Sequence, residues 1–244
     1  LADYLNGLEW DGQSRLSSWL STYIGAEPSA YVSEVGKRWL ISAVARALKP
    51  GCKADHMLVL EGTQGKLKST ALATLASVDW FGDNLPAMGS KDAQEYLPGH
   101  WIIEAAELEA MRREVDQIKA FISRQTDRFR PAYGREVITQ PRRCVFAGST
   151  NKDDWQRDVT GGRRFWPVKV GIIDIDALKQ DRNQIWAEAV ALYRAKEIWW
   201  LTGDVEEAAR LEVAARAASD DPWTADVLDF VSGKDEVAIV NVLA

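Results

Sequence analysis

The stretch "HMLVLEGTQGKLKST", residues 56–70, contains an apolar run, a turn with two glycines and a Lys-Ser pair. A short apolar run closed by a glycine is typical of a buried β-strand, and "STALATLAS", residues 69–77, predicts a helix directly after the turn. Backbone N–H groups between a strand and a helix can converge on a phosphate group. The stretch therefore contains a candidate nucleotide-binding loop, made of Gly62, Thr63, Gln64, Gly65, Lys66, Leu67, Lys68, Ser69 and Thr70.

The loop departs at one position from the phosphate-loop pattern G-x-x-x-x-G-K-[ST], because Leu67 stands where the pattern has its second glycine. That glycine usually has a positive φ angle, which costs a leucine roughly 1–2 kcal/mol. In a working site, Lys68 would reach the β- and γ-phosphates and Ser69 would offer its hydroxyl to Mg²⁺. The loop alone leaves two interpretations open: a nucleotide site, or a surface turn that happens to contain glycine and lysine.

Two carboxylates follow a second predicted strand, "HWIIEAAEL", residues 100–108. In a parallel α/β sheet, ligands collect at the carboxyl ends of the strands, so Glu104 and Glu107 would face the phosphate loop. Glu104 could supply a Mg²⁺ ligand, directly or through water, and Glu107 could orient or deprotonate an attacking water. The alternative is a pair of exposed glutamates that open the next helix.

Further polar residues border two more predicted strands. "CVFAGSTN", residues 144–151, ends at Asn151, which could sense the γ-phosphate or hold a water, although asparagine is also an ordinary turn residue. In "DVTGGRRFWPV", residues 158–168, Arg163 and Arg164 lie between a Gly-Gly turn and a strand. A guanidinium there suits an arginine finger offered to a neighbouring subunit. Alternatively, the two arginines pair with surface carboxylates.

The stretch "DRFRPAYGREVITQPRR", residues 127–143, predicts a β-hairpin around Pro131 to Gly134. Cations with interleaved aromatics are typical of single-strand binding, and Arg128, Arg130, Tyr133 and Arg135 are the predicted nucleic-acid contacts. A solvated hairpin with Phe129 and Tyr133 packed inward is the alternative. The local positive charge comes from Lys119 and six arginines: Arg124, Arg128, Arg130, Arg135, Arg142 and Arg143.

Composition sets the wider limits. The chain has 244 residues, a hydrophobic fraction of 46% and a formal charge of −6, which suits a globular protein and argues against a uniformly basic nucleic-acid coat. Cys52 and Cys144 are far apart, and His56 and His100 have no metal-type spacing, so the sequence argues against disulfides and zinc and favours a reducing cytoplasm. No apolar run approaches membrane-spanning length, which argues against a membrane partner.

Apolar strands that alternate with helices predict an α/β fold with a parallel sheet flanked by helices. We expect an N-terminal helical segment over 1–56, a P-loop NTPase core over 57–201 and a C-terminal helical segment over 202–244. The last segment is expected to begin a truncated module, in a chain that is a piece of a longer protein.

The order of these motifs resembles the virulence-associated E family of phages and mobile islands. That family is similar to superfamily-3 helicases of the AAA+ P-loop class, which are often attached to a primase domain. The resemblance extends from the first helices to Lys196 and is carried by "RWLISAVARALKPGCKADHMLVLEGTQGKLKST" (38–70), "GSKDAQEYLPGHWIIEAAEL" (89–108), "IKAFISRQTDRFRPAYGR" (118–135), "RRCVFAGSTN" (142–151) and "TGGRRFWPV" (160–168).

The resemblance implies a role for each candidate residue. Lys68 and Ser69 match the phosphate-loop pair, and Glu104 matches the acid beside Mg²⁺, with Glu107 as the partner for water. Asn151 matches the polar sensor, Arg163 or Arg164 the arginine finger, and the hairpin from Arg130 to Arg135 the DNA-facing element of a hexamer channel. Two departures, Leu67 and Ala105 in place of a second acid, affect hydrolysis more than binding.

The first hypothesis is therefore an ATP- and Mg²⁺-dependent DNA helicase or translocase that supports replication of a phage or mobile element. It would act on single-stranded or forked DNA as a hexameric ring, with a primase domain elsewhere in the full-length protein. The alternative is a degenerate P-loop module that binds DNA or a protein and holds nucleotide without efficient hydrolysis. A kinase-like phosphotransferase is a third hypothesis, which the chain supports less because it shows no evident lid or acceptor site.

Overall fold

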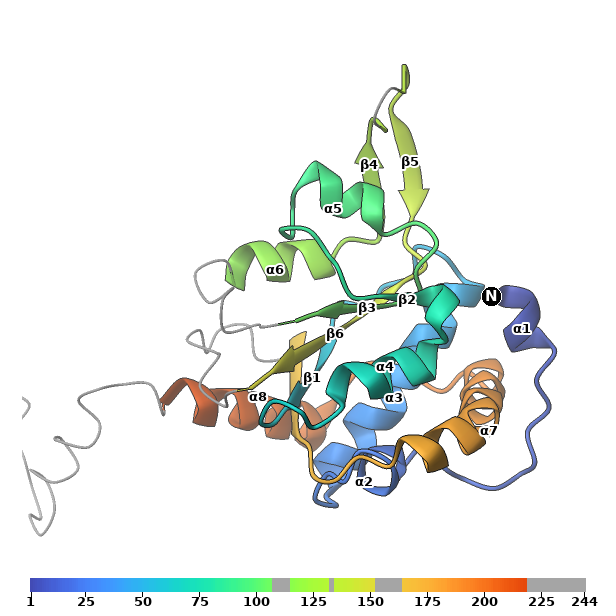
Figure 1. The fold of residues 1–244 in the computed structure, drawn as a ribbon, viewed down its shortest axis with the longest axis vertical. Helices are drawn as coiled ribbons and strands as arrows, with labels where there is room; N and C mark the ends of the chain where they lie inside the picture. Colours follow the sequence, from blue (N-terminus) through green and yellow to red (C-terminus); the bar gives the residue numbers. More distant parts are fainter. Residues whose placement is uncertain (107–114, 132–133, 152–163, 219–244) are drawn as a thin grey trace, which may run out of the picture.

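The computed structural model describes residues 1–106, 115–131, 134–151 and 164–218 (Figure 1). A five-stranded, fully parallel sheet lies at its centre, with the strand order β2-β3-β6-β1-β7. This confirms the predicted α/β fold with a parallel sheet flanked by helices. The strands are β1 (Met57–Glu61), β2 (Phe81–Gly82), β3 (Ile102–Ala105), β6 (Val145–Thr150) and β7 (Phe165–Lys169).

Strand β1 lies between two parallel neighbours and is buried along its whole length. Its side chains alternate between two hydrophobic clusters, with Leu58 and Leu60 on one face of the sheet and Met57 and Val59 on the other. A strand that is covered on both faces is apolar along most of its length. This explains why the run before the loop reads as continuously hydrophobic rather than alternating.

Helices cover both faces of the sheet (Figure 1). The face with Leu58 and Leu60 packs against the larger cluster, to which α3, α4 and α7 contribute, while α5 and α6 contribute to the cluster on the opposite face. Helix α8 packs against the edge strand β7 and places Ala209 in the first cluster and Val213 in the second. These helices are α3 (Ala30–Leu48), α4 (Lys68–Ala76), α5 (Lys91–Tyr96), α6 (Val115–Ile122), α7 (Ile175–Arg194) and α8 (Gly203–Ala218).

The N-terminal residues pack onto the same helical layer. Two short helices, α1 (Ala2–Asn6) and α2 (Trp19–Thr22), are followed by α3, whose N-cap Ser29 accepts a hydrogen bond from the Val32 backbone N–H. Glu188 of α7 is buried and accepts hydrogen bonds from the backbone N–H groups of Arg15 and Leu16. The predicted division into segments 1–56, 57–201 and 202–244 stays a prediction.

The β-hairpin projects from the body of the molecule (Figure 1). It consists of the antiparallel strands β4 (Thr126–Phe129) and β5 (Ile138–Pro141), in which Phe129 is paired with Ile138.

A single-turn 3₁₀ helix, η1 (Val78–Trp80), precedes β2. Within the described ranges, no helix is long and apolar enough to cross a lipid bilayer.

Candidate active site: a phosphate loop at the carboxyl end of the sheet

The predicted phosphate loop joins the end of β1 to the start of α4. Leu67 is the N-cap of α4 and has φ 60° and ψ 24°, which is the left-handed backbone region. Gly65 also has a positive φ, of 84°. The loop thus takes up the backbone that the glycine pattern requires, even though a leucine stands at the second position. Leu67 is 49% exposed, so its side chain is not part of the hydrophobic core.

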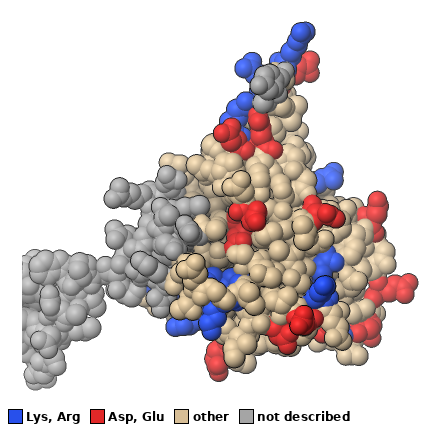
Figure 2. Space-filling model, viewed as in Figure 1, with Lys and Arg blue, Asp and Glu red and all other residues tan. Residues whose placement is uncertain are grey.

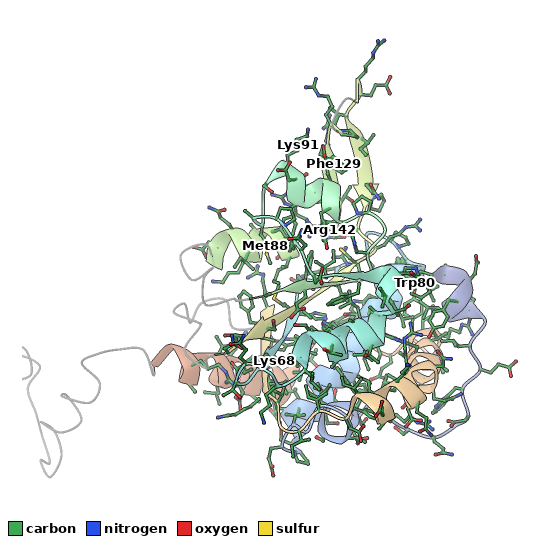
Figure 3. All side chains as sticks on the ribbon, in the orientation of Figure 1. Lys68, Trp80, Met88, Lys91, Phe129 and Arg142 are labelled. Atoms are coloured by element: carbon green, nitrogen blue, oxygen red, sulfur yellow. The ribbon has the colours of Figure 1, made fainter. Side chains whose placement is uncertain are left out.

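Lys68, the first residue of α4, bends back over the loop that precedes it (Figure 3). Its side chain is buried, and its Nζ donates hydrogen bonds to the carbonyl oxygens of Gly62 and Thr63 and to Oδ1 of Asn151, the last at 3.2 Å. These three hydrogen bonds hold the lysine at the mouth of the loop. A bound phosphate would offer charged acceptors at the same place, and charge-assisted hydrogen bonds are stronger.

Ser69 and Glu104, the two residues predicted to hold Mg²⁺, are in direct contact. The Ser69 hydroxyl donates to Oε1 of Glu104 at 2.8 Å, and Glu104 is buried in β3. Mg²⁺ binds oxygen at about 2.0–2.1 Å in octahedral geometry, which puts adjacent ligands roughly 3 Å apart. The residues present therefore fit a Mg²⁺ site, with a hydroxyl and a carboxylate as adjacent oxygens.

Asn151 follows the last residue of β6, next to the loop. Thr150 is paired with Glu61 across the sheet, and its carbonyl accepts a hydrogen bond from the Gly62 N–H at 3.2 Å. The structure therefore brings Asn151 together with Lys68, as the hydrogen bond between them shows. The carboxyl ends of β1, β3 and β6 thus place a lysine, a serine, a glutamate and an asparagine around one loop.

Arg164 lies away from this group. It precedes β7, whose first residue Phe165 is paired with Met57 at the opposite end of β1 from the phosphate loop. Its Nε donates to the hydroxyl of Ser123 at 3.0 Å. The structure does not bring Arg164 to Lys68 of the same chain. Three other predicted site residues, Glu107, Arg163 and Tyr133, lie outside the described residues.

Of the predicted nucleic-acid residues, Arg128, Arg130 and Arg135 of the hairpin lie within the described residues, and all three are exposed. Figure 2 shows basic side chains at the projecting tip. The hairpin leads into β6 at its amino-terminal end, so it leaves the sheet at the edge opposite the phosphate loop.

Part of the predicted basic and aromatic surface of the hairpin is structural. Arg142 is buried and forms a two-pronged ion pair with Asp127 at 2.6 and 2.7 Å, while its third nitrogen donates to the Phe121 carbonyl. Lys119 is also buried and pairs with Asp116. Phe129 is only 7% exposed, so for this ring the inward-packed alternative is correct. Arg142 and Lys119 therefore contribute to the local positive charge of the sequence but are buried, and they do not form part of an exposed basic surface.

Sequence reasoning missed an ion pair beside the loop. Arg216 of α8 donates to both carboxylate oxygens of Glu61, at 2.5 and 2.6 Å, and also to Glu212 at 2.7 Å. Burial lowers the pKa of the Arg216 guanidinium, but hydrogen bonds and charges from Glu61 and Glu212 outweigh it, so the pKa lies above its ordinary value. A carboxylate that ends an otherwise apolar strand, one residue before the loop glycine, was the available signal.

A parallel sheet with a phosphate loop between a central strand and a helix defines the P-loop class of nucleotide-binding folds. Within this class, the chain belongs to the virulence-associated protein E-like domain family, whose model matches residues 5–218. This confirms the resemblance drawn from the order of the motifs. A comparison with curated proteins found no match.

Solved structures of the NrS-1 C-terminal region share the fold. Its A-form apo structure is 16% identical with a TM-score of 0.59, and 97% of this chain aligns with 63% of that one. An apo structure of the same region, residues 305–718, is 14% identical with a TM-score of 0.58, and the alignment covers 97% and 62% of the two chains. The chain thus spans less than two thirds of these structures, and identities this low show likeness of fold alone.

Proposed function

We propose that this protein is a P-loop ATPase that acts as a DNA helicase or translocase in the replication of a phage or mobile element. The observation that carries the proposal is the convergence of Lys68, Ser69, Glu104 and Asn151 at the carboxyl ends of three parallel strands. Membership of the virulence-associated protein E-like family supports it, because the family model covers the strands and helices that carry all four residues.

Each of these side chains has a role in the proposed reaction. Lys68 moves from the carbonyl oxygens of the loop to the β- and γ-phosphates of ATP. Ser69 and Glu104 would hold Mg²⁺, which supplies charge neutralisation between the phosphates when bound. Asn151, which accepts a hydrogen bond from Lys68, contacts the γ-phosphate or the water beside it. Glu107, the next carboxylate along the chain after Glu104, orients the attacking water.

The arginine finger is proposed to act between subunits. Arg164 lies at the edge of the sheet opposite its own phosphate loop, so it serves a loop only when it comes from a neighbouring chain. Arg163 is the other candidate. This requirement supports self-association, and a closed hexameric ring is the assembly we propose.

Single-stranded or forked DNA is the proposed partner of the hairpin. Arg128, Arg130 and Arg135 provide exposed cations on a projecting element, as contacts to the phosphate backbone require. In a ring, such a projection would face the channel. A primase domain elsewhere in the full-length protein would complete a replication enzyme.

A second function is favoured by one specific feature, the leucine at position 67. A protein with this loop could bind nucleotide and DNA without efficient hydrolysis, because Leu67 and Ala105 occupy positions that matter for turnover. In this alternative, Mg·ATP binding remains and turnover is absent even with DNA present.

The proposal is tested by the rate of ATP hydrolysis with and without single-stranded DNA. Wild-type protein should hydrolyse ATP faster with DNA, and Lys68→Ala should reduce the rate by at least roughly a hundredfold, because the main cation on the transferred phosphate is lost. Lys91→Ala, which removes an exposed lysine on α5, is the matched control and should leave the rate unchanged. Equal rates in Lys68→Ala and wild type would refute the proposal. Mg·ATP binding without turnover in wild type would favour the binding module.

A further inference from the structure

Glu61 has an unusual position for a buried carboxylate. It is the last residue of the central strand β1, it is 1% exposed, and the next residue is Gly62, the first of the phosphate loop. The carbonyl of Gly62 accepts a hydrogen bond from Nζ of Lys68. Glu61 is thus the chain neighbour of the residue whose carbonyl positions the ammonium group of Lys68.

The partner of Glu61 comes from the far end of the described chain. Arg216 lies in the last turn of α8 and donates from Nε and from one terminal nitrogen to the two oxygens of Glu61. Its other terminal nitrogen donates to the backbone carbonyl and the carboxylate of Glu212, which fixes the guanidinium on the helix. Tyr31 of α3 also lies near this ion pair. Burial raises the pKa of the Tyr31 hydroxyl, and the positive charge of Arg216 acts in the opposite direction.

The ion pair between Arg216 and Glu61 is better suited to orienting the Glu61 side chain than to raising the stability of the fold. Taking two charges out of water offsets most of their attraction, so a buried ion pair adds little net stability compared with an apolar pair. A two-pronged guanidinium–carboxylate contact does fix direction, because both groups are planar and both hydrogen bonds must form together. The contact therefore fixes the orientation of the Glu61 side chain relative to α8 within a narrow range.

We propose that Arg216 is a positioning residue for the phosphate loop: through Glu61 it couples the docking of α8 to the conformation of Gly62 and Lys68. Coupling of this kind is reciprocal, so a nucleotide on the loop also strengthens the docking of α8. The consequence for nucleotide affinity rests on the function proposed above. The coupling between α8 and the loop does not, because it is a property of the nucleotide-free protein.

The test compares hydrogen–deuterium exchange of the backbone amides of residues 62–67 in the whole chain without nucleotide. Arg216→Lys keeps the charge but loses the fork, and Glu61→Gln keeps the shape but loses the charge. Both variants should speed exchange in the loop by roughly tenfold while exchange in β6 is unchanged. The matched control is Arg210→Lys on the same helix, where the exposed arginine pairs with Glu206 and Glu207, and its loop should exchange as in wild type.

Two results would overturn the inference. Loop exchange that equals wild type in both variants would show that the ion pair does not position the loop. Exchange that rises equally in the loop and in β6 would show a contribution to global stability only.

A Mg·ATP titration of the same proteins separates this inference from the proposed function. Affinity weakened by roughly tenfold in Arg216→Lys supports both. If wild type does not bind Mg·ATP, the proposed function fails while the exchange measurement still decides the coupling. If wild type binds and Arg216→Lys binds equally well, the effect of Arg216 on the nucleotide is excluded and the proposed function stands.

Discussion

At position 67 a leucine occupies backbone dihedral angles that favour glycine, with φ 60° and ψ 24°. Left-handed backbone brings the Cβ of a non-glycine residue close to the following carbonyl, at a cost of roughly 1–2 kcal/mol. The rest of the loop keeps the phosphate-loop form, so the surrounding contacts enforce this conformation. Lys68 contributes to these contacts, because its Nζ donates hydrogen bonds to the carbonyl oxygens of Gly62 and Thr63.

The stability of variants at position 67 should follow how readily each residue adopts a positive φ angle. Leu67→Gly relieves the steric strain, whereas Leu67→Val introduces a branched Cβ, which tolerates a positive φ worst. We expect the free energy of unfolding of Leu67→Gly, measured by urea denaturation, to exceed that of Leu67→Val by about 1–2 kcal/mol. Leu67→Asn, which accepts left-handed backbone more readily, should lie between them. Equal stability of the glycine and valine variants would mean that the loop is not held in this conformation in solution.

Single residues also mark the limits of the sequence-based prediction. The contacts of Ser69 with Glu104 and of Lys68 with Asn151 join residues from the loop and two predicted strands, and the carboxyl ends of parallel strands always meet at one edge. The burial of Arg142 was not predictable in the same way. Its partner Asp127 is found only once the register of the hairpin is known.

At the scale of elements, the hairpin projects from the body of the molecule (Figure 1). Its two strands pair over four residues each, and the base is fixed by the buried pair of Arg142 and Asp127. The remaining arginines project into solvent, where single-stranded DNA can reach them. The buried structural arginine of this hairpin and the arginines proposed to bind DNA are thus different residues.

Removal of charge from the tip should weaken DNA binding. In the double variant Arg130→Ala with Arg135→Ala, affinity for single-stranded DNA should fall, and the slope of log affinity against log salt should become shallower by roughly 1.4, about 0.7 for each lost phosphate contact. Fluorescence anisotropy over a salt series measures both. Arg210→Ala, an exposed arginine on α8, is the control and should change neither. An unchanged slope in the double variant would disprove the assignment of the hairpin to DNA.

Elements with a strong pattern were predicted and weak ones were not. Strands β1, β3, β6 and β7 read as buried apolar runs, because parallel strands inside an α/β sheet are covered on both faces. Strand β2 has only two residues and α5 has six, which is too short to show a period. Their positions depend on the neighbouring strand β3 and on the second hydrophobic cluster.

At the scale of the whole molecule, the two edges of the sheet carry different parts of the proposed machinery. The phosphate loop lies at the carboxyl edge, while Arg164 and the base of the hairpin lie at the amino edge. Under the proposed mechanism, a subunit arranged in this way completes its active site only with an arginine from a neighbour. The sequence alone could not show this separation, because it depends on where β7 begins relative to β1.

The requirement for a neighbour can be tested by mixing variants. Lys68→Ala has no working loop, and Arg164→Ala has no finger, so each alone should be inactive. In mixed assemblies, a Lys68→Ala subunit supplies its arginine to the intact loop of an Arg164→Ala subunit, and ATP turnover should exceed the sum of the separate rates. Arg163→Ala, mixed in the same way, identifies which arginine acts. Absence of rescue in both mixtures, with self-association by light scattering equal to wild type, would exclude an arginine acting between subunits.

The central claim is that the loop from Gly62 to Thr70 is a working nucleotide site despite its leucine. The most direct measurement is a calorimetric titration of Mg·ATP into the wild-type chain, Lys68→Ala and the control Lys91→Ala. The account predicts saturable binding to wild type and to Lys91→Ala, and binding to Lys68→Ala that is lost or weakened by roughly a hundredfold or more. Undiminished binding to Lys68→Ala, or no binding to any of the three proteins, would contradict it.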